Sequence, residues 1–166
     1  MPWQVKPIRP ARMKIDPVMR EVLNTCDAEG RFQMRELFKT TQTWKHKVGF
    51  GYLVDTSGGN ASVRTSAKSG NVQIWNMLDA GTRPHLIVAR KAKQLRFRTG
   101  YRAKTRPRWF GSGSGGASGP WRGPHAVKHP GTAARFWTRT LSQQRQIRFR
   151  RDIQAAVKRG ARQLYR

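Results

Sequence analysis

The spacing of hydrophobic positions over residues 17–43 is that of an amphipathic helix. Asp16 and Pro17 form a typical helix start, because aspartate accepts free backbone N–H groups and proline fits the first helical position. Gly30 interrupts the apolar face and predicts a kink or a split in the helix. The face expected to be buried consists of Met19, Val22, Leu23, Cys26, Leu37, Phe38, Thr41 and Trp44.

Strict alternation follows this helix and predicts a β-hairpin. The two strands are expected over 48–56 and 61–67, with the turn SGGN at 57–60 between them. Their apolar faces would consist of Val48, Phe50, Tyr52 and Val54, and of Ala61, Val63 and Thr65. The next stretch, 71–80, fits a strand by one pair of residues and a helical turn by another, so the pattern leaves both open.

The second half of the chain alternates between short apolar runs and loop-forming composition. Strands are predicted near 86–89 and 94–98, joined by a basic turn. The stretch GSGSGGASGP at 111–120 has the composition of a flexible loop. A C-terminal helix is expected over 133–165, with a bend near 143–148 because its two apolar stripes are out of phase there. The stripes are Trp137 and Leu141, then Phe149, Ile153, Val157, Gly160 and Leu164.

The N-terminal segment has a different composition from the rest of the chain. Residues 1–16 hold three prolines and read as an extended arm, leaving 17–166 as a single domain. With 37% hydrophobic residues among 166, we expect a small core with exposed appendages.

Charge is distributed unevenly along the sequence. The chain has 34 Lys and Arg against 8 Asp and Glu, a net charge of +26. Residues 1–82 carry 12 basic and 7 acidic side chains, whereas 83–166 carry 22 basic side chains and a single acid, Asp152. The electrostatic field of such a charge attracts nucleic acid, anionic lipid or acidic protein surfaces. The charge therefore indicates the kind of partner and says nothing about the fold.

Several classes of protein are disfavoured by what the sequence lacks. Cys26 is the only cysteine and is expected to be a small buried helix residue, with neither a disulfide framework nor a zinc cluster. No apolar run approaches the roughly 18 residues of a membrane span, and the start lacks the apolar stretch of a signal peptide. We therefore expect a protein of a soluble, reducing compartment, with no membrane partner.

Candidate catalytic groups are sparse and scattered. No motif of a metalloprotease, serine hydrolase, phosphate-binding loop or dinucleotide fold occurs. His125 and His129 are four apart, but neighbouring prolines argue against a helix that presents both to a metal. Asp79 and His85 could form an acid–base pair, although an aspartate capping the Gly81 turn is the better expectation. We expect no enzyme and no cofactor.

Cations interleaved with aromatic residues make nucleic-acid binding a serious alternative, because they suit phosphate contact and base stacking. No groove-reading module is recognisable, so such binding would be independent of sequence. The candidate contacts, to nucleic acid or to an acidic partner, are Arg90, Lys91, Lys93, Arg96, Arg98, Arg102, Lys104, Arg106, Arg108, Arg148 and Arg151. Tyr101 and Trp109 lie among them, and the C-terminal helix adds Arg145, Arg150, Lys158, Arg159 and Arg162.

Two stretches carry a resemblance to a known family. WNMLDAGTRPHLIVARKAKQLRF, residues 75–97, and VKHPGTAARFWTRTL, residues 127–141, resemble two signatures of minor tail and tail-completion (neck) proteins of long-tailed bacteriophages. The residues that carry the match are Asp79, Gly81, Thr82, His85, His129, Pro130, Gly131, Phe136 and Trp137. Arg135 stands where many relatives have proline.

The resemblance implies an α+β fold, in which a small antiparallel sheet is packed by the long N-terminal helix and the C-terminal helix. It also implies a structural role in the virion: a hexameric ring at the head–tail neck around the DNA path, assembled in the host cytoplasm. Partners would be further copies of the chain, the tail terminator, the tail tube and the head-completion or connector proteins, with DNA as a candidate in the lumen. Candidate contacts between subunits are Trp3, Val5, Ile8, Trp109 and Trp121.

The physical reading of the two signatures is structural. Gly81 is expected at a backbone conformation that other residues avoid, with Asp79 and Thr82 bonding the turn. Pro130 and Gly131 would stop a strand, so that Phe136 and Trp137 lock the last helix onto the sheet. The alternative function, a sequence-independent nucleic-acid-binding protein of ribosomal or packaging type, predicts binding by the isolated monomer.

Overall fold

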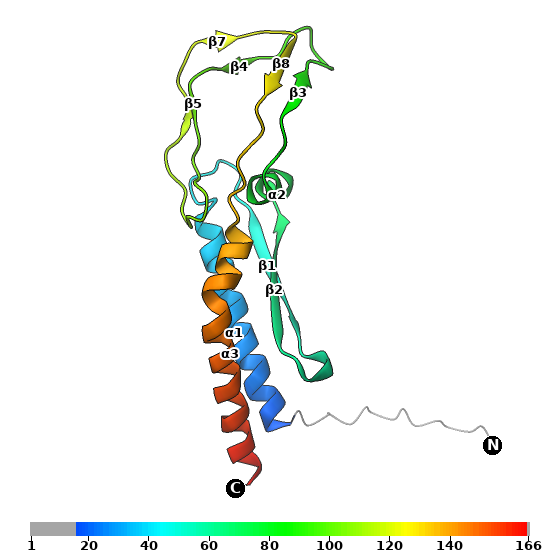
Figure 1. Cartoon of the computed structure of the whole chain (residues 1–166), viewed down its shortest axis with the longest axis vertical. Helices are drawn as coiled ribbons and strands as arrows, with labels where there is room; N and C mark the ends of the chain where they lie inside the picture. The colour runs from blue at the N-terminus through cyan, green and yellow to red at the C-terminus, as the bar shows by residue number, and fades with distance from the viewer. Residues whose placement is uncertain (1–15, 166) are drawn as a thin grey trace, which may run out of the picture.

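The molecule is elongated, with helices at one end and an arch of paired strands at the other (Figure 1). The structure is a computed structural model that describes residues 16–165. The predicted arm and its candidate contacts Trp3, Val5 and Ile8 lie outside the described residues. Within residues 16–165, three α-helices and small antiparallel sheets make an α+β fold, as expected. The strands form four two-stranded sheets rather than one sheet.

The first helix, α1, spans Pro17–Lys39. The Asp16 carboxylate accepts the Val18 N–H at 2.7 Å, so the predicted cap is confirmed. The helix ends four residues before the predicted boundary, and turns follow. It also runs unbroken through Gly30, where the predicted kink is absent. A Cβ at that position would lie 2.3 Å from the Tyr52 ring, so the glycine serves a close approach of the hairpin instead.

The predicted hairpin is confirmed and lies along α1. Strands β1 (Gly49–Asp55) and β2 (Ser62–Ser69) are antiparallel, joined by the short 3-10 helix η1 (Ser57–Gly59). Val54 and Val63 face each other in this register and pack toward the helices, whereas Leu53 is 63% exposed. The sequence alternation therefore gives the correct inner face.

Residues 71–80, for which the sequence pattern left strand and helix open, form the helix α2 (Val72–Ala80). Trp75 is buried and donates its indole N–H to the Thr40 hydroxyl at 3.0 Å. The ring also meets Phe50 of β1 edge to face, at 5.1 Å between centroids. Because this ring needs three surrounding elements, periodicity over ten residues could not select the helix.

The last helix, α3, spans Trp137–Leu164 and packs antiparallel along α1 (Figure 1). It begins at residue 137 rather than 133, because Phe136 takes a left-handed conformation with φ of 54°. The helix is continuous through residues 143–148, where a bend was predicted. Val157 and Leu164 are 42% and 54% exposed, so their predicted place in the buried stripe is wrong. Ala156 and Gly160 are the buried residues of that part of α3.

The two apolar stripes of α3 belong to two separate clusters. One joins Trp137 and Leu141 to α1, α2 and the hairpin, and consists of Leu37, Val48, Trp75, Trp137 and Leu141. The other consists of Val22, Cys26 and Ala156, with Phe149 and Ile153 packed against it. The phase change that suggested a bend is therefore a change of partner along a continuous helix.

The arch is a long, two-stranded antiparallel ribbon. Its ladders are β3 (His85–Val88) with β8 (Ala126–His129), β4 (Phe97–Arg98) with β7 (Trp121–Arg122), and β5 (Tyr101–Arg102) with β6 (Gly116–Ala117). The predicted strands near 86–89 and 94–98 thus exist, but each pairs with the returning chain and not with the other. The stretch predicted to be a flexible loop, 111–120, contains the two-residue strand β6.

The ribbon curves back, and its tip rests on the helical end. The Thr43 hydroxyl donates to the Gly113 carbonyl at 2.9 Å, and the Arg108 N–H donates to the Arg135 carbonyl at 2.7 Å. The Trp137 indole N–H donates to the Trp109 carbonyl at 2.9 Å. These contacts close the arch at its base, next to the start of α3. None of the helices between residues 16 and 165 is long and apolar enough to cross a membrane.

Candidate functional site

The two signature stretches meet in one corner at the base of the arch. Thr82 and Thr132 exchange backbone hydrogen bonds of 2.9 and 3.1 Å, and the Thr82 hydroxyl accepts the same Thr132 N–H. Gly81 and Gly131 take φ values of 79° and 85°, as the prediction for Gly81 required. A Cβ on Gly131 would lie 2.3 Å from the Thr82 carbonyl oxygen. Two backbones therefore approach more closely than any side chain allows.

Asp79 caps a different element from the one predicted. Its carboxylate accepts the Thr138 N–H at 3.3 Å and the Thr138 hydroxyl. The N-terminus of α3 has free N–H groups, and Phe136 in the cap position supplies no side-chain acceptor. The Asp79 carboxylate therefore caps the N-terminus of α3, and not the Gly81 turn as predicted. This is a second contact between the two signature stretches.

The histidines of the signatures form a pair without a carboxylate. The rings of His85 and His129 lie 4.9 Å apart across the β3–β8 ladder, and His129 accepts the Gly131 N–H at 3.1 Å. The conjectured acid–base pair does not form, because Asp79 contacts Thr138 instead. Within residues 16–165, no cluster of three or more His, Cys, Asp or Glu side chains could hold a metal ion.

Trp137 anchors α3 in the manner predicted, whereas Phe136 does not. The Trp137 ring is fully buried and stacks on Trp75, with centroids 5.6 Å apart and planes at 25°. Phe136 remains 42% exposed. The αL conformation of Phe136 turns the chain so that only the following side chain enters the core. The lock is made against α1, α2 and β1 rather than against a broad sheet.

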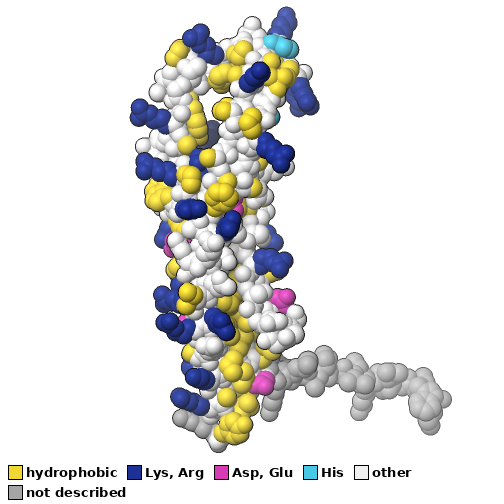
Figure 2. All heavy atoms as spheres, in the orientation of Figure 1, with side chains coloured by type: hydrophobic (Ala, Val, Ile, Leu, Met, Phe, Trp, Pro, Cys, Tyr) yellow, Lys and Arg dark blue, Asp and Glu magenta, His cyan; other side chains and the backbone are white. Residues whose placement is uncertain are grey.

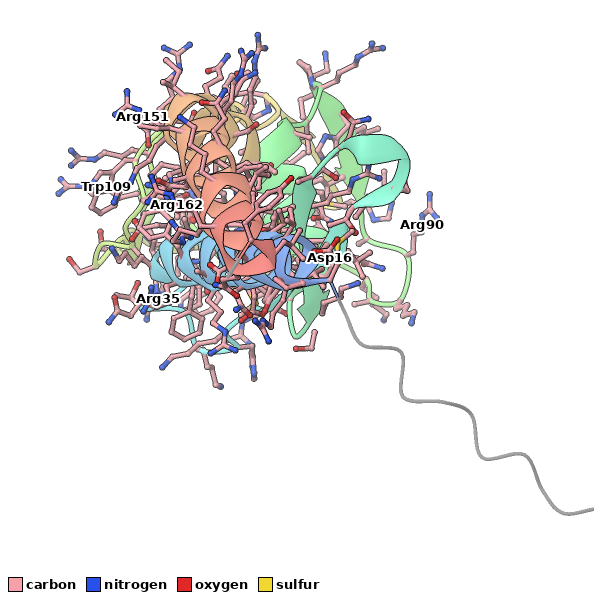
Figure 3. All side chains as sticks on the ribbon, turned by 90° about the horizontal axis from the view of Figure 1, so that it is seen from below. Asp16, Arg35, Arg90, Trp109, Arg151 and Arg162 are labelled. Atoms are coloured by element: carbon pink, nitrogen blue, oxygen red, sulfur yellow. The ribbon has the colours of Figure 1, made fainter. Side chains whose placement is uncertain are left out.

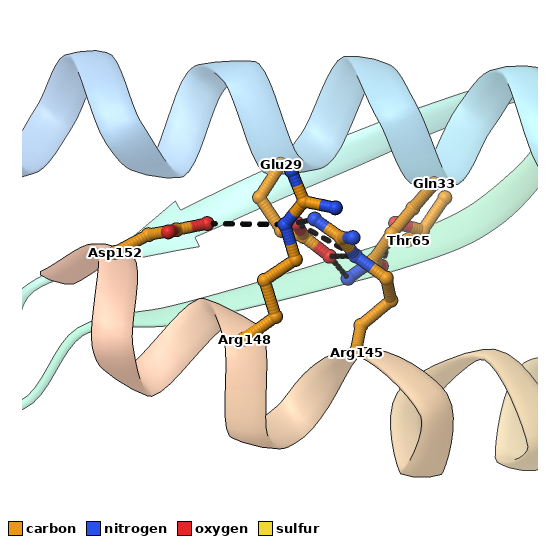
Figure 4. A network of polar contacts seen from close by, with 6 residues as sticks. All are labelled: Glu29, Gln33, Thr65, Arg145, Arg148 and Asp152. Carbon is orange, nitrogen blue, oxygen red and sulfur yellow. Dashed lines mark hydrogen bonds and ion pairs between the residues drawn. The ribbon is translucent and has the colours of Figure 1, made fainter.

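A polar network lies between the two apolar clusters (Figure 4). Arg145 of α3 donates to both carboxylate oxygens of Glu29, with a closest distance of 2.6 Å. Glu29 also accepts from Gln33, which in turn accepts the hydroxyl of Thr65 on β2. The hydrogen bond to Glu29 raises the pKa of Arg145 above its usual value. This network ties α1, α3 and the hairpin together.

Part of the basic C-terminal helix is thus committed within the molecule. Besides Arg145, Arg159 pairs with Glu21 of α1 at 3.1 Å. That hydrogen bond lowers the pKa of Glu21. Arg148 lies 3.9 Å from Asp152 of its own helix, and Arg151 is exposed. Of the cations named for the C-terminal helix, Arg145 and Arg159 are therefore paired with carboxylates of α1.

Among residues 16–165, the arch carries most of the positive charge that is not paired with a carboxylate. Residues 82–135 contain 13 Lys and Arg and no Asp or Glu. The guanidinium carbons of Arg96 and Arg98 lie 5.0 and 5.1 Å from the centre of the Trp121 ring, which stays 54% exposed. Arg106 stands 6.0 Å from the Trp109 ring in a looser version of the same arrangement. Lys and Arg side chains mark the visible face from end to end, whereas few carboxylates appear (Figure 2).

The predicted contact residues do not share a single face. Arg90, Lys91 and Lys93 lie in the turn between β3 and β4. The others of the arch lie on or next to β4 and β5 and in the loop that follows β5, and they are Arg96, Arg98, Arg102, Lys104, Arg106 and Arg108. Seen along the long axis, Trp109 and Arg151 project to one side and Arg90 to the other (Figure 3). One partner could not contact all the predicted residues without wrapping around the molecule.

Sequence reasoning missed that two charged residues, Glu29 and Arg135, are buried. Glu29 is 4% exposed in the middle of the apolar face of α1, and the out-of-phase residues of α3 opposite it were a signal for such a polar layer. Arg135 is 8% exposed at the arch base, and its departure from the family pattern was the sole hint. Comparisons with protein-family models, curated proteins and solved structures find no match for this chain.

Proposed function

We propose that this chain is a structural virion protein of the head–tail neck of a long-tailed bacteriophage. It would be a minor tail or tail-completion component whose copies form a ring, a hexamer by the family pattern, joining the tail to the head connector around the DNA path. One observation supports this most. The two stretches that resemble the family, some fifty residues apart, meet in the corner built by Gly81, Thr82, Gly131 and Thr132.

The corner suits a repeating assembly because it holds the arch and the helical end at one angle. Backbone-to-backbone contact at two glycines, with Asp79 capping α3, leaves little freedom between the parts. A ring closes only when every subunit repeats the same geometry. Trp109 and Trp121 are 45% and 54% exposed on the arch, and a neighbouring subunit or connector protein would cover them.

Light scattering and negative-stain imaging of the purified protein test this proposal. Rings or tail-bound particles are expected for the natural chain, and a Trp109→Ser, Trp121→Ser variant should assemble poorly while keeping its fold. Leu53→Ser on the distant hairpin is the control, since Leu53 is just as exposed. A chain that stays monomeric at every concentration, even with neck and tail proteins added, contradicts the proposal.

A second function is supported by a separate observation. The absence of any carboxylate over 82–135, with Arg96 and Arg98 both close to the Trp121 ring, suits sequence-independent nucleic-acid binding. The isolated protein would then bind duplex DNA with a steep salt dependence. Each phosphate contact removed should lower the salt slope by about one.

The matched variants for that alternative differ only in where charge is removed. Arg96→Gln with Arg98→Gln should weaken DNA binding and reduce the slope by about two. Arg150→Gln with Arg162→Gln removes equal charge from exposed positions of α3 and should change little. Equal losses from the two pairs would mean that the field of the whole molecule, not the arch, is responsible.

A further inference from the structure

A cleft opens at the base of the arch, where the returning ribbon passes α2. Its volume is about 460 Å³. The segment after α1, α2 and both sides of the ribbon contribute to its walls, which include Trp44, Lys45, His46, Tyr101, Lys104 and Arg135. The size is that of small-molecule sites in general. His129 and Thr132, from the second signature stretch, also line it.

Arg135 is a buried cation without an acidic partner. The side chain is 8% exposed, and its Nε donates to the Thr105 hydroxyl at 3.3 Å. The terminal nitrogens make no hydrogen bond or ion pair with the residues from 16 to 165. No buried side-chain nitrogen in that range lacks a partner, so these two retain accessible surface. Arginine keeps its charge in proteins, and a charge withdrawn from water needs a counter-charge.

The other charged residues at the cleft are also positive, which increases the need for a negatively charged ligand. Lys45 and Lys104 add two formal positive charges, and His46 also lines the wall. No Asp or Glu is among the described residues that line it. The carboxylate at the end of α2, Asp79, is bound to Thr138 and is not among the lining residues. The cleft is thus a cationic site with three fixed charges.

We propose that this cleft binds a phosphate group carried by a nucleotide. The fork of the Arg135 guanidinium, with two lysine side chains lining the same cleft, matches the several oxygens and the multiple charge of a phosphate better than a single carboxylate. Trp44 and Tyr101, with apolar Ile74 and Leu78, provide walls for a planar base. The phosphate comes from a free nucleotide or from a nucleic-acid strand end, and the proposal does not depend on ring formation.

Isothermal titration calorimetry on the full chain tests the site. The probes are inorganic phosphate, adenosine monophosphate and a short 5′-phosphorylated single-stranded oligonucleotide, each at constant ionic strength. Lys45→Gln with Lys104→Gln should weaken binding about tenfold or more for each charge-assisted hydrogen bond lost. Lys158→Gln, which removes one charge from an exposed position of α3, is the control and should bind as the natural chain does.

A second pair of variants addresses Arg135 itself. Arg135→Lys keeps the charge and loses the fork, whereas Arg135→Gln loses both, so binding should weaken in that order once circular dichroism shows both to be folded. Binding of the monophosphate, or of the oligonucleotide alone, with loss in the cleft variants supports the proposal and identifies the source of the phosphate. Affinity that is unchanged by the Lys45 and Lys104 substitutions, or that falls as much in Lys158→Gln, overturns it.

Discussion

Substituting alanine for glycine at the corner isolates the contact on which the proposed architecture depends. Gly131 combines a φ of 85° with a backbone oxygen 2.3 Å from the place of a Cβ. The left-handed conformation costs an L residue about 1–2 kcal/mol. Forcing an atom into a packed site costs about 1–3 kcal/mol more. We expect Gly131→Ala to lower the free energy of unfolding by about 3 kcal/mol.

Two other glycines separate these contributions. Gly59 has a φ of 74° with nothing within 4 Å of a built Cβ, so Gly59→Ala should show the conformational cost alone, about 1 kcal/mol. Gly116 has neither a positive φ nor a close neighbour, and Gly116→Ala should change stability by less than about 0.5 kcal/mol. Gly81→Ala, whose Cβ would lie 2.9 Å from Thr132 and Ala134 backbone atoms, should resemble Gly131→Ala.

Urea denaturation followed by tryptophan fluorescence measures the series. With a slope of about 2 kcal/mol per molar urea, a loss of 3 kcal/mol moves the midpoint by about 1.5 M. The slope itself should stay constant if only the native state is affected. A Gly131→Ala midpoint equal to that of Gly59→Ala would refute the reasoning, since the close approach of the two turns would then contribute nothing.

Three further predictions concern the helical end. Glu29→Gln should destabilise by about 3 kcal/mol, because Arg145 is left partly buried without its counter-charge, whereas Glu29→Met with Arg145→Met should recover most of the loss in thermal unfolding. The hydrogen bond from Arg159 lowers the pKa of Glu21 below its usual value of 4.5, so the pair stabilises the folded protein above that pH and is lost as the pH falls. The free energy of unfolding of Glu21→Gln, measured against pH, should therefore vary less below about 4.5 than that of the natural chain. Burial raises the pKa of Cys26, which is fully buried, so its thiol should react with Ellman's reagent only as fast as the chain opens, and rapid native-state labelling would contradict this burial.

The residue pattern anticipated turns at Gly81 and at Pro130 and Gly131, but not that these turns contact each other. Gly81 was expected at positive φ, and the structure confirms this. Asp79 was assigned to the wrong neighbour because a sequence shows short-range caps only, and Thr138 lies 59 positions away. Nothing in the sequence indicated that Arg145 and Arg159 are paired. In the structure α3 packs along α1, and the two arginines form ion pairs with Glu29 and Glu21.

The spacing of apolar residues alone predicted the long N-terminal helix, the hairpin and the C-terminal helix. Counting residues alone showed the excess of positive charge after residue 82. These follow from the 3.6 and 2.0 residue periods and from counting, which need no neighbour. Tertiary structure alone decided that α2 is a helix, that the Gly-Ser stretch enters a ribbon, and that Arg135 is buried beside a cationic cleft. Each of these depends on contacts between residues far apart in the chain, whose energies no short window of sequence contains.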